Sequence, residues 1–88
     1  MAAYAIEVRK GYTIVTVRGR KDDFILGMRT GMATQREAIR IWANWAYGLV
    51  EDGEIPLYIA ESLLDTLERR AEAALPSPVK WLRRFLGV

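Results

Sequence analysis

Large apolar residues alternate with small or charged ones at the start of the chain. Tyr4, Ile6 and Val8 recur at every second position, which is the period of a strand with one buried face. Residues 12–18 are rich in β-branched side chains and predict a second strand. Residues 24–29 predict a third, shorter strand.

The links between these predicted strands are short. Lys10 and Gly11 predict a tight turn because glycine tolerates positive φ, and residues 19–23 are polar and turn-like. Links of this length join neighbouring antiparallel strands. We therefore expect a three-stranded antiparallel β-meander within residues 1–31.

A helical pattern follows over residues 33–52. Thr34 and Glu37 have the spacing of a capping box, in which Thr34 accepts a hydrogen bond from the Glu37 amide and Glu37 reaches back. Gly53 is suited to end the helix in a left-handed conformation.

The apolar arc of this helix covers about half of its circumference, which is wider than packing on one sheet requires. We expect the helix to touch the sheet and something else. Trp42 and Trp45 lie on the apolar arc and are interpreted as core residues. If they are exposed, they become anchors for a partner instead, because Trp dominates binding hot spots.

Two more helices are predicted, over residues 56–75 and 78–87. Pro56 and Pro78 suit the first turn of a helix, and Pro76 stops the helix before it. The longer helix carries an apolar stripe of Leu57, Ala60, Leu63, Leu64, Leu67, Ala71 and Ala74. Three strands followed by three helices predict an α+β fold, and 88 residues suit a single domain.

The composition removes several kinds of chemistry. The chain has no cysteine and no histidine, so thiolate metal sites and the commonest general base are missing. We therefore expect no enzymatic activity, no cofactor, no metal and no small-molecule substrate. The start of the chain does not have the pattern of a signal peptide, and no stretch approaches the roughly 20 apolar residues of a membrane span. We expect a cytoplasmic protein.

Charge is unevenly spread along the chain. The formal net charge is +4 over residues 1–40, −5 over residues 41–75 and +3 over residues 76–88. Such segregation predicts surfaces of opposite potential.

Four acidic residues share one face of the helix predicted over residues 56–75. They are Glu61, Asp65, Glu68 and Glu72. A solvated helix face is the favoured interpretation. Arg69, four residues after Asp65, reduces the repulsion between the acidic side chains. The alternative is a docking stripe for a basic partner, such as the Lys80, Arg83 and Arg84 of another copy. A magnesium or calcium site is less favoured, because such sites usually draw ligands from several elements.

Basic residues gather in the predicted sheet. They are Arg9, Lys10, Arg18, Arg20, Lys21 and Arg29. The favoured interpretation is that they keep strand edges soluble. The alternative is nucleic-acid binding, in which they neutralise phosphates. In strand order, with a helix after the third strand, the chain resembles some integrase amino-terminal DNA-binding domains. This resemblance concerns architecture alone.

The last predicted helix has aromatic and basic sides. Trp81 and Phe85 lie on its apolar side, while Arg83 and Arg84 lie on the other. Packing of the apolar side on the first two helices is favoured. A membrane surface and a partner protein are the alternatives for these four candidate binding residues.

The favoured function is a small non-enzymatic protein-binding module. It would be an inhibitor, adaptor or regulator, of a size common on phages and plasmids, and would also bind itself as a homodimer. The first alternative is a nucleic-acid-binding protein that uses the basic sheet. The second alternative is a peripheral membrane protein that uses the last helix.

Overall fold

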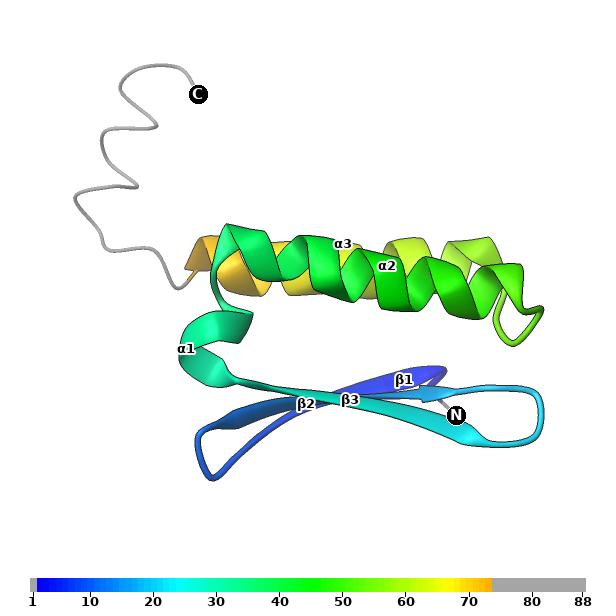
Figure 1. Ribbon diagram of the computed structural model, residues 1–88, viewed down its shortest axis with the longest axis horizontal. Coiled ribbons are helices and arrows are strands. Elements are labelled where there is room, and N and C mark those ends of the chain that lie inside the picture. The colour runs from blue at the N-terminus through cyan, green and yellow to red at the C-terminus, as the bar shows by residue number, and fades with distance from the viewer. Residues whose placement is uncertain (1, 74–88) are drawn as a thin grey trace, which may run out of the picture.

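The strands and the long helices form two layers (Figure 1). The computed structural model describes residues 2–73. Its elements are β1 (Tyr4–Arg9), β2 (Tyr12–Arg18), β3 (Asp23–Arg29), α1 (Thr30–Ala33), α2 (Arg36–Glu51) and α3 (Leu57–Ala73). Three antiparallel strands followed by helices confirm the predicted α+β class.

The sheet has the order β1-β2-β3, and β2 pairs antiparallel with both neighbours. The β1–β2 link is the predicted two-residue turn, with φ of 53° at Lys10 and 83° at Gly11. Positive φ at both turn residues matches the right-handed twist of the strands that they join. The meander expected from the sequence is confirmed, and β3 begins one residue earlier than predicted, at Asp23.

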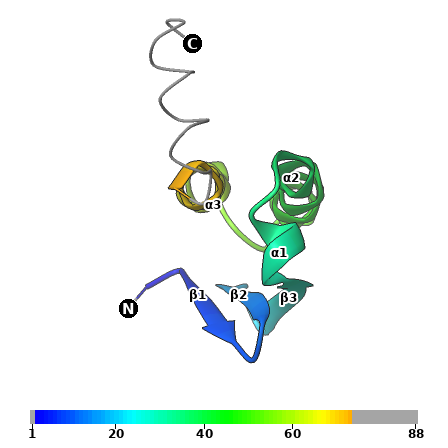
Figure 2. The ribbon, with the colours of Figure 1, turned by 90° about the vertical axis from the view of Figure 1, so that its left-hand side faces the viewer.

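One face of the sheet packs against the helices. The register aligns Ile6, Val15 and Leu26 in one row across the three strands, and all three belong to the core or pack against it. Val15 and Val17 of β2 are fully buried. The central strand is the most enclosed because it has a strand on each side and the helix layer above it (Figure 2).

Helix α2 packs beside α3, and its buried Trp42 belongs to the same core cluster as Val15 and Val17 of the sheet, which explains the wide apolar arc of the helix (Figure 2). Trp42 is fully buried, as expected. Trp45 is half-buried, packs against the core and meets the Trp42 ring edge-on, with the ring centroids 6.4 Å apart. The second contact of this helix, which the sequence pattern left unspecified, is therefore with α3.

The predicted capping box at Thr34 is wrong. The short helix α1 precedes α2, and the Thr34 hydroxyl donates a hydrogen bond to the Thr30 carbonyl at 3.0 Å. The N-cap of α2 is instead Gln35, in an extended conformation and without a side-chain capping bond. The chain must break its helical path here, because it turns from the end of the sheet into the second layer.

The end of α2 is as predicted, with φ of 76° at Gly53. The loop after it is tied to the sheet, because a carboxylate oxygen of Glu54 accepts a hydrogen bond from the Arg20 amide at 3.0 Å. Gly19 sits at the same junction. A Cβ added there would lie 2.5 Å from the ring of Phe24, so only glycine fits without a shift.

Helix α3 buries most of the stripe predicted for it, namely Ala60, Leu63, Leu64, Leu67 and Ala71. Leu57 is the exception, with half of its surface exposed. Ile55, which precedes the helix, belongs to the buried core at this end of the molecule. At this end of the molecule the loop residue Ile55 therefore closes the core, whereas the sequence pattern predicted Leu57 for that role.

Within residues 2–73, no helix combines the length and the apolar character that crossing a membrane requires. The helix predicted over residues 78–87 lies outside the described residues, as does Ala74 of the predicted stripe.

Candidate functional site

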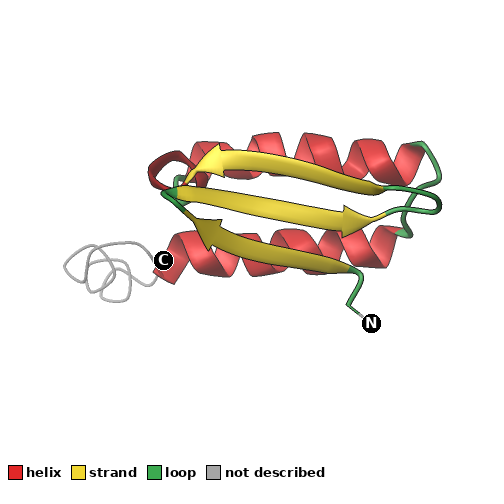
Figure 3. Cartoon of the chain, turned by 90° about the horizontal axis from the view of Figure 1, so that it is seen from below, coloured by secondary structure: helices red, strands yellow, loops and turns green. Residues whose placement is uncertain are grey.

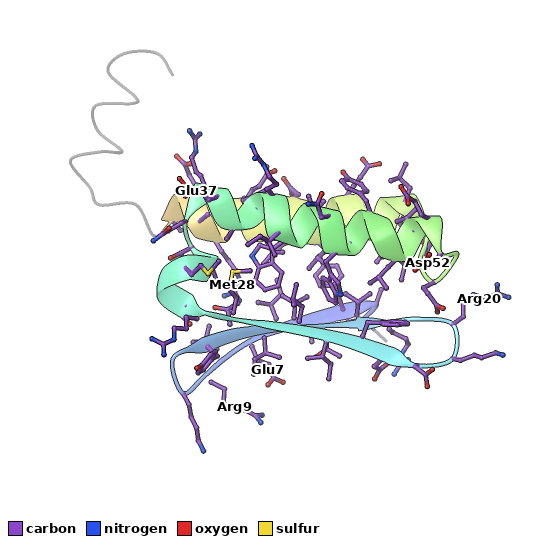
Figure 4. All side chains as sticks on the ribbon, viewed as in Figure 1. Glu7, Arg9, Arg20, Met28, Glu37 and Asp52 are labelled. Atoms are coloured by element: carbon purple, nitrogen blue, oxygen red, sulfur yellow. The ribbon has the colours of Figure 1, made fainter. Side chains whose placement is uncertain are left out.

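The two long helices cover one face of the sheet, and the opposite face is open (Figure 3). Strand residues alternate between faces, so the register defines the residues of this open face. They are Ala5, Glu7, Arg9, Tyr12, Ile14, Thr16, Arg18, Asp23, Ile25, Gly27 and Arg29. All eleven are exposed or half-buried. Glu7 and Arg9 point away from the helix layer (Figure 4).

The middle rows of the open face mix apolar and polar side chains. One row across the strands holds Ala5, Thr16 and Ile25, and the next holds Glu7, Ile14 and Gly27. Ile25 has 65% of its surface exposed. The outward positions of an antiparallel sheet with one solvated face are usually polar. Ile25, in a middle row of the edge strand β3, therefore departs from this pattern.

The two ends of the open face are charged. At one end, Arg9, Tyr12 and Arg29 form a row across all three strands, next to Lys10 in the turn. The carboxylate of Glu7 pairs with Arg9 at 3.2 Å, in an exposed position.

At the other end, Arg18 lies opposite Asp23, and Arg20 and Lys21 follow in the loop between β2 and β3. The six predicted basic residues thus lie in the sheet layer but form two groups. Tyr12 and Arg18, which mark the two ends, are six positions apart along β2, which corresponds to about 20 Å.

The two layers carry opposite charge. The formal net charge is +3 over residues 2–29, which form the sheet, and −4 over residues 30–73, which form the helix layer. The segregation seen along the chain therefore becomes a segregation between faces of the molecule.

The four acidic candidates, Glu61, Asp65, Glu68 and Glu72, are exposed on α3. Asp65 pairs with Arg69 one helical turn later. Two of the four, Glu68 and Glu72, also line a groove against α2. In the part of the chain that the structure describes, no three acidic side chains are grouped so that they could hold a metal ion.

The remaining partner-binding candidates are Trp81, Arg83, Arg84 and Phe85, and they lie outside the described residues. The sequence interpretation did not single out Ile14 and Ile25 as surface residues. Their alternation with the buried Val15 and with the half-buried Phe24 and Leu26 was the available signal.

Comparisons of the chain with protein families, with curated proteins and with solved structures found no match.

Proposed function

We propose that the chain is a small protein-binding module without catalytic activity, which acts as an inhibitor, adaptor or regulator. Its partner binds on the open face of the sheet. The observation that supports this proposal best is Ile25, with 65% of its surface exposed in a middle row of the face, on the edge strand β3. Exposed apolar side chains flanked by charged residues are usual in protein interfaces.

The charges of the open face indicate the chemistry of the partner. Arg9 and Arg29 at one end, with Arg18 at the other, favour a partner that has acidic groups around an apolar patch. The net charge of +3 over residues 2–29 speeds the encounter with such a partner at low ionic strength.

The test compares two exposed positions on opposite layers. Ile25→Asp places a charge on β3 in a middle row of the open face, whereas Tyr58→Asp places one on α3, where Tyr58 is 70% exposed. Each variant and the wild-type chain are used to retain proteins from cells that produce the chain naturally, and the retained proteins are identified by mass spectrometry.

We expect one protein to be retained by the wild-type chain and by Tyr58→Asp, and to be lost with Ile25→Asp. Circular dichroism checks that both variants keep the fold. Equal retention by Ile25→Asp and the wild-type chain contradicts the proposal.

Nucleic-acid binding at the same face is the second candidate. The observation that favours it is the position of all six basic candidates, Arg9, Lys10, Arg18, Arg20, Lys21 and Arg29, in the sheet layer. Affinity for duplex DNA should then fall steeply as salt rises, and should drop when Arg9 and Arg29 are replaced by Ala. No binding at low salt excludes this candidate.

The homodimer expected from the sequence stays a prediction. Three strands of about six residues present a patch of about 14 by 20 Å. Two such patches fall below the 1,200 Å² or so of a small stable interface. Binding through this face alone, whether to a second copy or to another protein, should therefore be weak. Sedimentation over a range of concentrations tests self-association.

The cytoplasm is the compartment that we propose, because a chain without cysteine has no disulfide to gain from an oxidising environment. The proposal of a peripheral membrane protein rests on residues 78–87, which lie outside the described part of the chain.

A further inference from the structure

A groove of about 680 Å³ lies between the start of α2 and the end of α3. The first residue of α2, Arg36, and the last of α3, Ala73, are 37 residues apart in the sequence, but these helix ends lie side by side in the fold (Figures 1 and 2). The apolar lining of the groove comes from Ile39 of α2 and Ala71 of α3. A groove with apolar side chains on both helices is suited to cover apolar side chains of another segment.

The groove has an acidic lining on both sides. Glu37 lines it from α2, and Glu68 and Glu72 line it from α3. Arg36 is the one basic residue among the described lining residues, so their formal net charge is −2. This charge favours a cationic occupant.

The chain itself supplies such an occupant close by. Helix α3 is described to Ala73, and its last turn lines the groove. Residues 74–88 carry three basic side chains, Lys80, Arg83 and Arg84, and no acidic one. Only four residues, 74–77, separate the end of α3 from the amphipathic segment 78–87.

We propose that residues 78–87 bind in the groove between α2 and α3 of the same chain. In the helix that the sequence predicts for this segment, successive residues turn by about 100°. Arg83 and Arg84 then flank the apolar side, one next to Val79 and the other next to Trp81. The apolar side faces Ile39 and Ala71, and the two arginines reach the glutamates on the two walls.

The same chain is favoured over a second copy because of the short link. Four extended residues span at most about 14 Å, which keeps segment 78–87 near the groove. A short link of this kind gives an effective concentration in the millimolar range. A second copy reaches that concentration only in very concentrated solution. This proposal is independent of the open sheet face.

Nuclear magnetic resonance on the full chain tests the proposal. We expect nuclear Overhauser contacts between the methyl groups of Ile39 and side chains of residues 78–87. Mixing isotope-labelled and unlabelled chains separates contacts within one chain from contacts between two copies. Absence of these contacts, or contacts found only between copies, overturns the proposal.

Charge reversal provides the second measurement. The double variant Glu37→Lys with Glu68→Lys should lose the contacts and should leave residues 78–87 with the relaxation rates of a free chain. Adding Arg83→Glu and Arg84→Glu to that variant should restore the contacts.

The matched control is Glu51→Lys with Glu61→Lys, which reverses exposed acids on the same two helices outside the groove lining. The control variant should keep the contacts. If the contacts between Ile39 and residues 78–87 survive the reversal of Glu37 and Glu68, charge does not hold the segment in the groove, and the proposal is overturned. Chemical shifts of the sheet report whether each variant remains folded.

Discussion

At the scale of the residue, Trp42 is the largest fully buried side chain. Its indole Nε1 has no hydrogen-bond partner within residues 2–73. Replacing a buried aromatic residue by Ala leaves a cavity, so Trp42→Ala should lower the free energy of unfolding by about 3–5 kcal/mol. Urea denaturation measures the loss, and a value below about 1 kcal/mol would contradict a core role for this residue.

The unpaired Nε1 group adds a second expectation at the same position. A buried donor without an acceptor costs about 1–3 kcal/mol. Trp42→Phe removes that donor and keeps an aromatic ring in the core. It should therefore destabilise the protein much less than Trp42→Ala does in the same denaturant series. Equal losses for the two variants would contradict this expectation.

A side chain at Gly19 should not fit, because its neighbours lie too close. A Cβ there would lie 2.5 Å from the Phe24 ring and 2.7 Å from the Asp22 carbonyl oxygen. Gly19→Ala should therefore lower the melting temperature by disturbing the β2–β3 loop. Gly31→Ala is the control, because a Cβ at Gly31 meets nothing within 4 Å. A thermal melt of Gly19→Ala that matches the wild-type melt would contradict the close approach.

At the scale of the element, α2 contains a glycine in its interior. A Cβ at Gly48 would meet nothing within 4 Å. Alanine is favoured over glycine inside a helix by about 0.8–1 kcal/mol. Gly48→Ala should therefore raise the free energy of unfolding by up to about that amount. A clear loss of stability in urea denaturation would indicate that Gly48 meets a neighbour that the fold does not place there.

The sequence predicted the elements that local patterns determine. The turn at Lys10 and Gly11, the buried position of Trp42 and the end of α2 at Gly53 each depend on a few neighbouring residues, and all three are confirmed. The capping box failed because Thr34 hydrogen-bonds backwards to Thr30 within α1. Nothing in the local pattern showed that the chain makes a separate helical turn there.

The candidate surfaces were harder to predict because they combine distant residues. Ile14 and Ile25 become neighbours on the open face only through the pairing of β2 with β3. The groove joins Glu37 to Glu68, which are 31 residues apart. Such features depend on how the elements pack, which the spacing of residue types does not specify.

At the scale of the whole molecule, the strand layer and the helix layer differ in the sign of their net charge. The sheet layer carries a formal net charge of +3 and the helix layer −4. The helices bury one face of the sheet and leave the other to solvent (Figure 3). The open face combines the exposed Ile25 in a middle row with charged ends, which is why we assign the partner to this face.

Photo-crosslinking from Ile25 tests this assignment most directly. Ile25 and Tyr58 are replaced, in separate chains, by the photoreactive residue benzoylphenylalanine, and both chains are irradiated in cells that produce the protein naturally. We predict a crosslinked adduct with one partner protein from position 25 and none from position 58. An adduct from position 58 alone, or none from position 25, would contradict binding at the open face.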